Sequence, residues 1–450
     1  SLYDPDLGSK WAEISSRYGD KWIYPLVRGD TVVGALELWE MSGCIEVRAM
    51  DLDSPDLLPE ALDAIDSMMG FYRMKGTDIV RIREILNTDA EKLEGPMVEA
   101  LTSRDYHLVN GFYARGRFEP WTMSEQEMLS YVFGKQRITR NGRYQTVAEA
   151  MEHRGYIRGD QELMVRVAER TTMKRQMERG GILKMALSPA YIGYTTMEMA
   201  QVYRAEKGFE PDRHARDLLK LISRKQPATK KEIVADSAFS PERTSEVLSE
   251  LSKNSVLYQD GDGRYNIVPD NGMDRHEAQK EIVRRHFRDF GMFSAETLSQ
   301  FVGGRMVVTR TILRELEDEG FLRKGFLVRD DPTLYWILSE DVGVKPARVL
   351  DNFVLNSQDN LHIYLRGMIK AETGAGANSV IFSGTRIVGS FKGKVCASGA
   401  KVEEFQGSDR AARILKEAAQ SVGVSLETQR QRDDDDWDVS EFYLKVNTGA

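Results

Sequence analysis

The stretch GDTVVGALELWE, residues 29–40, has a near copy, GTRIVGSFKGKV, at residues 384–395. Each copy begins with Gly, places a pair of β-branched residues before a second Gly, and then alternates apolar and polar side chains. Such alternation predicts a β-strand with one buried face. The first Gly fits a turn, and the second fits a β-bulge or a sharp bend. The two copies therefore predict related β-rich modules near both ends of the chain.

Both copies continue in the same way, with a turn near Gly, a second alternating run and then a helical pattern. The apolar residues at helical spacing are Leu58, Ala61, Leu62, Ile65 and Met69 in the first copy, and Ala412, Ile414, Ala418 and Val422 in the second. The predicted order is strand, turn, strand, helix. Internal repeats usually mean repeated supersecondary units, and short bent strands are common in small barrels. We therefore expect two barrel-like modules, each with a packed helix.

The middle of the chain changes to helices followed by hairpins, most clearly at residues 274–340. Three helical patterns, EAQKEIVRRHF, MFSAETLSQFVGG and RMVVTRTILRELEDEGFL, lead into FLRKGFLVRDDPTLYWIL. Ser294 can cap the second helix and Gly320 can end the third. The last segment predicts strand, turn and strand. Three helices and a β-hairpin in this order are typical of a winged helix.

Residues 213–268 repeat this pattern. Thr229 and Glu232 have the spacing of a capping box, and Pro241 suits the first turn of the third helix. The run Asp260-Gly261-Asp262-Gly263 is a strong hairpin signal. A third and weaker copy is predicted around residues 122–168.

Together these patterns predict an α+β multi-domain protein, with tandem winged-helix domains flanked by two barrel-like β modules. The expected segments are an N-terminal β-rich module (1–90), a helical region with a possible winged helix (91–190), two winged helices (191–270 and 271–345) and a C-terminal β-barrel-like module (346–450).

The bulk composition excludes several classes. No apolar run approaches the roughly 18 residues that a membrane span needs, and the N-terminus carries no signal-peptide pattern. Cys44 and Cys396 are too few for a disulfide framework or a zinc cluster. The histidines form no metal-binding motif, and no GxSxG nucleophile motif is present. We expect a cytoplasmic protein without metal or cofactor.

The net charge of -8 hides an uneven distribution. Residues 1–80 contain 15 Asp and Glu against 7 Lys and Arg, whereas residues 135–184 contain 12 Lys and Arg against 6 Asp and Glu. A basic face attracts phosphate whatever the global charge. The alternative is that these charges simply solvate exposed helices.

A winged helix can place its third helix in the DNA major groove and its hairpin against the adjacent backbone. The candidate nucleic-acid contacts in the later unit are Arg305, Thr309, Arg310 and Arg314 on the helix (with Thr311 as an added contact) and Arg323 and Lys324 on the hairpin. Those in the earlier unit are Arg243, Lys253 and Arg264. Winged helices also serve as protein–protein modules, which leaves a solvated or protein-bound face open.

Residues 285–450 resemble the C-terminal region of large helicase-related (Lhr-type) proteins and the related winged-helix DNA glycosylases that include AlkX and YcaQ. The segments that carry the resemblance are FGMFSAETLSQFVGG, ILRELEDEGFLRKGFLVRD, VLDNFVLNSQDNLHIYL, FSGTRIVGSFKGKV and DRAARILKEAAQSVGV. The resemblance implies tandem winged helices followed by a β-barrel. It is weaker over residues 90–270.

The Lhr-type resemblance implies a DNA-binding accessory region of an ATP-dependent helicase. The chain contains no GxxxxGK[ST] loop, so we expect no ATP hydrolysis by it. We expect the partners to be single-stranded, duplex or forked DNA, and helicase motor domains that belong to the same natural polypeptide, of which this chain is a C-terminal fragment or a stand-alone relative.

The glycosylase resemblance implies hydrolysis of a base–sugar bond, in DNA repair, by an acidic residue and a polar partner. Those enzymes carry a Gln-x-Asp pair in an early winged helix, and the corresponding place here lacks it. Asp359 matches an acidic position of the relatives and is a weak catalytic candidate, although capping of a helix that begins near Leu361 is the favoured role. A third hypothesis is a protein-interaction scaffold, in which the acidic first module docks onto residues 135–184.

Overall fold

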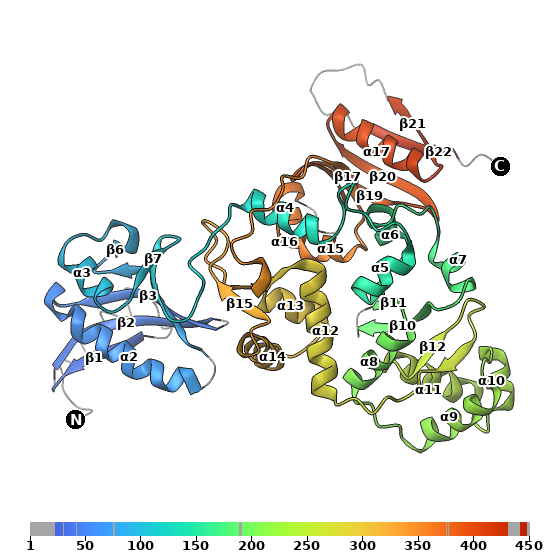
Figure 1. Ribbon diagram of the computed structural model, residues 1–450, viewed down its shortest axis with the longest axis horizontal. Helices are drawn as coiled ribbons and strands as arrows, with labels where there is room; N and C mark the ends of the chain where they lie inside the picture. Colours follow the sequence, from blue (N-terminus) through green and yellow to red (C-terminus); the bar gives the residue numbers. More distant parts are fainter. Residues whose placement is uncertain are drawn as a thin grey trace. The chain divides into compact units, whose positions relative to one another are not determined.

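The computed structural model describes residues 23–29, 31–41, 43–74, 77–188, 191–374, 376, 378–430 and 442–447 (Figure 1). The chain forms two compact units. The first consists of Ser1–Glu125 and Met292–Val344, and the second of Gln126–Gly291 and Lys345–Ala450. Helices and several sheets occur in both units, which confirms the α+β class.

The N-terminal part of the first unit is a sheet with the strand order β1-β2-β3-β4-β8-β7 and a helix along one face (Figure 1). Its elements are β1 (Ile23–Arg28), β2 (Thr31–Met41), β3 (Cys44–Leu52), η1 (Pro55–Leu57), α2 (Leu58–Met74), β4 (Ile79–Ile82), β5 (Glu84–Ile85), β6 (Thr88–Asp89), η2 (Ala90–Lys92), α3 (Pro96–Thr102), β7 (His107–Val109) and β8 (Phe112–Arg115). Leu58, Leu62 and Ile65 of α2 are buried in the core beneath it, as the helical spacing predicted.

The C-terminal part of the second unit is a sheet with the order β17-β18-β19-β20-β22-β21, with α17 packed on it (Figure 1). Its elements are β17 (Asn352–Leu355), α15 (Asn360–Tyr364), α16 (Arg366–Thr373), β18 (Ser379–Ser383), β19 (Arg386–Cys396), β20 (Gly399–Gly407), α17 (Asp409–Ser421), β21 (Ser425–Arg430) and β22 (Phe442–Asn447). Ala412 and Ile414 face the core, as predicted.

The repeated sequence forms the same local structure in both units. Gly29 and Gly384 have φ angles of 62° and 63°, in the left-handed region that a tight turn uses. Gly34 and Gly389 each lie beside a register shift in the neighbouring strand, which is the predicted bulge. A Cβ at Gly34 would lie 2.4 Å from a backbone carbonyl oxygen of β3, and one at Gly389 would lie 2.8 Å from a carbonyl of β20. Close strand approach therefore requires Gly at both positions.

The strand–turn–strand–helix order is confirmed in both copies, as β2-β3-α2 and β19-β20-α17. The barrel part of the prediction is not confirmed. Over the described residues each sheet runs from one edge strand to another, and neither closes.

A helix–helix–helix–hairpin arrangement forms in the second unit where the sequence predicted it. It consists of α9 (Arg213–Lys225), α10 (Lys230–Asp236), α11 (Pro241–Lys253), β12 (Leu257–Gln259) and β13 (Tyr265–Ile267) around one apolar core. The capping box of Thr229 and Glu232 is present, and Ser240 caps α11 with Pro241 in its first turn. We call this group the α9–β13 winged helix.

The later predicted winged helix is divided between the units. Its second and third helices and its hairpin lie in the first unit, as β14 (Met292–Ser294), α13 (Ala295–Val302), α14 (Met306–Asp318), β15 (Leu322–Gly325) and β16 (Tyr335–Leu338), followed by η3 (Ser339–Asp341). Its expected first helix, α12 (Arg275–Phe290), belongs to the second unit, where it packs against α8 (Met197–Lys207) and α5 (Val147–Arg154).

Before α5 the second unit contains α4 (Glu125–Lys135). Between α5 and the α9–β13 winged helix, besides α8, it contains β9 (Tyr156–Ile157), α6 (Asp160–Arg166), α7 (Met173–Glu178), β10 (Leu183–Ser188) and β11 (Tyr191–Thr195). One sheet, in the order β13-β12-β10-β11-β9, joins these strands to the hairpin of the winged helix. In the region of the weaker predicted copy, α5 is therefore followed by a short strand of this larger sheet. Within the described ranges, no helix has the length and apolarity that crossing a membrane would demand.

Candidate nucleic-acid interface

Of the predicted groove-facing residues of α14, Arg310 and Arg314 lie against the N-terminal module within the first unit. Arg305 is the N-cap of α14, and the Thr309 hydroxyl is buried and donates to the Arg305 carbonyl oxygen at 3.3 Å. Arg310 Nη1 lies 3.8 Å from Glu40 Oε1. Arg314 lines a pocket of about 280 Å³ together with Glu40 and Arg310. One end of this helix surface is therefore covered by acidic and apolar groups of the same unit.

The predicted hairpin contacts are also engaged. Lys324 is buried, and its Nζ lies 2.7 Å from Asp78 Oδ1 and 3.2 Å from Glu317 Oε2. Arg323 Nε lies 4.0 Å from Glu119 Oε1. A buried lysine between two carboxylates presents no charge to a phosphate, so in this structure Lys324 packs the N-terminal module onto the hairpin. DNA contact by the exposed residues of this group stays a prediction.

The predicted contacts of the α9–β13 winged helix are exposed to different degrees. Arg243 is half-buried and donates to Glu246 at 2.9 Å, whereas Lys253 and Arg264 are exposed. The third helix also exposes Glu242, Glu246 and Glu250. Its solvent face is therefore more acidic than basic, which is unfavourable for a helix in the major groove.

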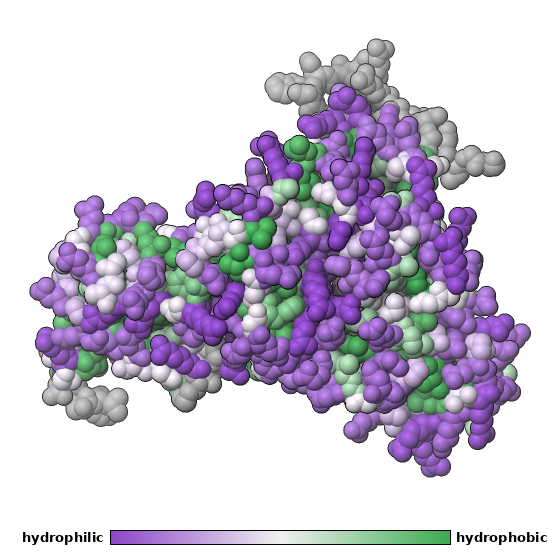
Figure 2. All heavy atoms as spheres, viewed as in Figure 1, coloured by the Kyte–Doolittle hydropathy of each residue, from purple (hydrophilic) through white to green (hydrophobic). Residues whose placement is uncertain are grey.

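The basic surface of this winged helix lies instead on its first helix and the start of its second. All the members of this basic face are exposed: Arg213, Arg216, Lys220, Arg224, Lys225, Lys230 and Lys231. On α9 the cations recur at i, i+3, i+7 and i+11, opposite the buried Ala215, Leu218 and Ile222. In Figure 2 the surface over α9 and α10, at the lower right, is largely hydrophilic. The helical spacing of these cations is visible in the sequence, but the sequence analysis placed DNA contacts only on the third helices and the hairpins.

Few acids oppose this face. Lys220 lies 3.5 Å from Asp217, and Lys225 pairs with Asp236. Within the described part of the chain, the other five cations of the basic face form no ion pair with a carboxylate. A cluster of unpaired cations on one face is an electrostatic feature of nucleic-acid-binding proteins.

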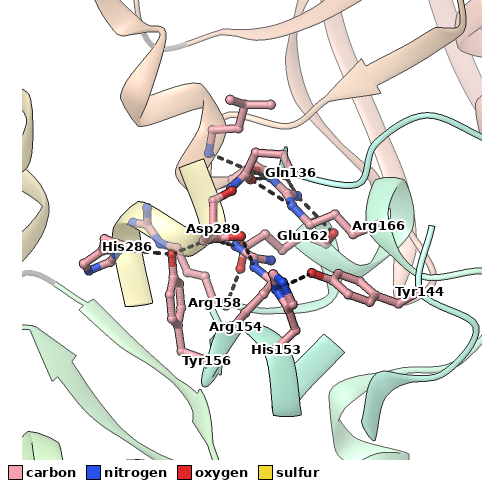
Figure 3. Close-up of polar contacts among 12 residues, drawn as sticks. Gln136, Tyr144, His153, Arg154, Tyr156, Arg158, Glu162, Arg166, His286 and Asp289 are labelled. Atoms are coloured by element: carbon pink, nitrogen blue, oxygen red, sulfur yellow. Dashed lines mark hydrogen bonds and ion pairs between the residues drawn. The ribbon is translucent and has the colours of Figure 1, made fainter. Parts of the chain in front are cut away.

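The basic stretch at residues 135–184 does not form one exposed basic surface, because two of its arginines are buried (Figure 3). Arg154 binds Asp289 of α12 through two bonds of 2.9 Å, and a third bond of 2.9 Å joins it to Glu162. Arg166 binds Asp359 through bonds of 2.5 and 2.7 Å. All five side chains are almost completely buried. We call them the buried ion network.

Gln136 joins the two halves of the buried ion network. Its Oε1 accepts from Arg166 Nη2 at 2.6 Å, and its Nε2 donates to the backbone carbonyl of Asp289 at 2.8 Å. Burial opposes ionisation of Asp289, but the guanidinium of Arg154 outweighs it and holds the pKa of this carboxyl below its ordinary value. The network links α4, α5, α6, α12 and α15, and thus organises the second unit.

Asp359, the weak catalytic candidate, is part of this network. Its Oδ1 also accepts from the Leu361 backbone N–H at 2.8 Å, so it is the N-cap of α15. Helix capping is the role that the sequence favoured. Because the carboxylate is buried and bound on both oxygens, its geometry is that of a structural group.

His286 adjoins the buried ion network and predicts a pH dependence. Tyr156 donates to Asp289 Oδ2 at 3.0 Å, and its hydroxyl lies 3.5 Å from His286 Nδ1. Burial lowers the pKa of His286 to about 4. Between this value and the ordinary one near 6.5 the unfolded chain binds a proton that the folded chain does not. The His286 contribution to stability is therefore complete above pH 6.5 and decreases as the pH falls toward 4.

We expect this contribution to amount to about 3 kcal/mol over that interval. Urea unfolding of the wild type and of His286→Gln at about pH 7.5 and about pH 4 measures it, with exposed His107→Gln as the matched control. The wild type should lose more stability on acidification than His286→Gln does. Parallel losses in the two proteins would contradict the neutral, buried state of His286.

The fold and the site define a class: a mixed α+β protein with several sheets, a buried ion network in its second unit and a basic surface on α9 and α10. The solved structure of the Streptomyces sahachiroi DNA glycosylase AlkZ is similar to this chain, with a TM-score of 0.52 and 15% identity. The match covers 68% of this chain and 98% of that one. Because the identity is only 15%, the likeness is one of fold. No known family model and no curated protein sequence matches the chain. In the described residues, no cluster of three or more His, Cys, Asp or Glu side chains has the arrangement of a metal site.

Proposed function

We propose that the chain binds DNA and that the basic face of α9 and α10 contacts the phosphate backbone. The observation that carries this proposal is the set of exposed cations without carboxylate partners on one side of the α9–β13 winged helix. Similarity of fold to a DNA glycosylase supports DNA as the partner. Each cation that meets a phosphate releases condensed counterions, so binding should weaken steeply with salt.

In this proposal the third helix of the winged helix does not enter the DNA groove. The exposed carboxylates of α11 repel the phosphate backbone, so we propose that α9 and the start of α10 contact the DNA instead. Arg264, exposed between β12 and β13, adds a contact at the hairpin. Such contacts position a protein on DNA without reading base sequence. Binding of duplex DNA across a salt series tests the proposal, and we expect little sequence preference.

Base excision is a second candidate function, favoured by the similarity to a DNA glycosylase. The expected Gln-x-Asp pair of such enzymes has a counterpart in spacing, Arg158-Gly159-Asp160, which runs from the residue after β9 to the first residue of α6. Asp160 is half-buried, and its Oδ1 accepts from the Met173 backbone N–H at 2.7 Å. One carboxylate oxygen is thus held in place, and among the described residues the side chain of Asp160 makes no other hydrogen bond or ion pair. We propose Asp160, in place of Asp359, as the acid of this candidate reaction.

This candidate predicts release of a damaged base that depends on Asp160. Oligonucleotides with uracil or an alkylated base should yield alkali-labile sites with the wild type and none with Asp160→Asn. Because Asn keeps an oxygen that accepts from Met173, the variant should unfold at the same temperature as the wild type. Asp359→Asn serves as a second variant, which should lose stability. Absence of base release by the wild type would remove the enzymatic candidate and leave DNA binding.

The accessory role in an Lhr-type helicase is a finer form of the DNA-binding proposal and rests on the sequence resemblance. It requires a motor domain outside this chain. Its test is a preference for forked DNA over a duplex of the same length, because a helicase accessory region works where strands separate. Equal affinities would speak against this role but not against DNA binding.

A further inference from the structure

A cavity of about 440 Å³ in the second unit is lined by four arginines. Arg140 and Arg143 come from the segment between α4 and α5, and Arg170 and Arg175 from the α6–α7 region. Leu163, Met164, Val167, Ala397 and Val422 add apolar wall. We call this site the arginine pocket. Its size is in the range of pockets that hold small ligands.

The charges of the arginine pocket are unbalanced. Among the described residues its one lining carboxylate is Glu169, which accepts from Arg179 Nη1 at 2.7 Å and from Gln176 Nε2 at 3.1 Å. The bond from Arg179 lowers the pKa of Glu169, so this acid is ionised and already bound. Across the described residues, the four lining arginines form no ion pair with a carboxylate.

Arg143 is the most constrained of the four. Its Nε is buried and has no hydrogen-bond partner among the described residues. Burial lowers the pKa of this guanidinium, the Asp351 charge opposes that effect, and the Arg140 charge adds to it. A buried N–H donor without an acceptor is destabilising, because the hydrogen bonds that it made to water are not replaced. A ligand with acceptor oxygens at this position would satisfy the donor.

We infer that the arginine pocket binds the terminal phosphate of a nucleic-acid strand. Guanidinium groups bind phosphate through paired N–H donors, and a phosphomonoester carries more charge than the diesters within a strand. The apolar wall formed by Leu163, Val167 and Val422 suits the sugar or base of the terminal nucleotide. This inference rests on the proposed DNA binding, to which it adds a preference for strand ends.

The test compares oligonucleotides that differ only in their ends. Fluorescence anisotropy measures the affinity of the whole chain for one strand with a 5′-phosphate, with a 3′-phosphate and with hydroxyl ends. We expect one phosphorylated form to bind about tenfold more tightly than the hydroxyl form. Hydrogen bonds between a charged guanidinium and the terminal phosphate would account for a difference of this size. Arg143→Gln and, separately, Arg170→Gln with Arg175→Gln should abolish this preference. The second variant alters exposed side chains only, so it should fold.

Arg413→Gln, an exposed arginine on α17 outside the pocket, is the matched control and should keep the preference. If the wild type binds phosphorylated and hydroxyl ends equally tightly, the inference is overturned, but the proposed DNA binding stands. If the wild type binds none of these strands, the proposed DNA binding itself is overturned. The free mononucleotide is a separate ligand, and its binding as tightly as a phosphorylated strand would overturn the assignment to strand ends.

Discussion

Asp289→Ala is expected to lower the free energy of unfolding by about 3–5 kcal/mol, because it leaves a buried guanidinium without its main partner. Arg154 makes two of its bonds to this carboxylate and has an almost completely buried side chain. The remaining bond to Glu162 cannot replace both. Urea unfolding at neutral pH measures the loss.

The matched control for this prediction is Asp270→Ala. Asp270 is exposed and lies 3.4 Å from Arg204, so its removal should cost no more than about 1 kcal/mol. Similar losses for the two variants would mean that the buried ion network does not hold the second unit together. A large loss only for Asp289→Ala supports it.

Neutralising four cations of the basic face should nearly abolish DNA binding. In the variant Arg213→Gln, Arg216→Gln, Lys220→Gln and Arg224→Gln, four phosphate contacts are lost. Each contact contributes about 0.9 to the slope of log affinity against log salt, so the slope should fall by about 3 to 4. At about 0.1 M salt this corresponds to a loss of roughly a thousandfold in affinity. Gln is a good helix former, so α9 should persist.

A control with the same change in net charge separates the basic face from general electrostatics. Lys392, Lys401, Arg410 and Arg413 are exposed on the C-terminal module. Replacing these four with Gln should leave most of the salt slope intact. If both variants lose affinity equally, the protein attracts DNA through net charge alone, and the basic face has no special part.

Features with local causes could be predicted from the sequence. The left-handed turns at Gly29 and Gly384 and the bulges beside Gly34 and Gly389 follow from residues that are close in the chain. The capping box at Thr229 is likewise a relation across three residues. These short-range signals fixed the strand–turn–strand–helix repeat and the α9–β13 winged helix.

Features with distant partners could not be predicted. Arg154 and Asp289 lie 135 positions apart, and Arg166 and Asp359 lie 193 apart. Nothing in the basic stretch marks these two arginines as internal, so their charges counted toward a surface that they do not join. The same reason explains Lys324, whose partner Asp78 lies 246 positions away. The basic face of α9 could have been predicted, because its cations recur at helical spacing. It was missed because winged helices usually bind DNA through the third helix.

Equilibrium binding of a short duplex across a salt series, with the wild type and the four-residue variant of α9, tests the central claim most directly. We expect a steep decline of wild-type affinity with salt and a slope that is smaller by about 3 to 4 in the variant. An unchanged slope in the variant, or wild-type binding that does not respond to salt, would contradict the assignment of the basic face to DNA.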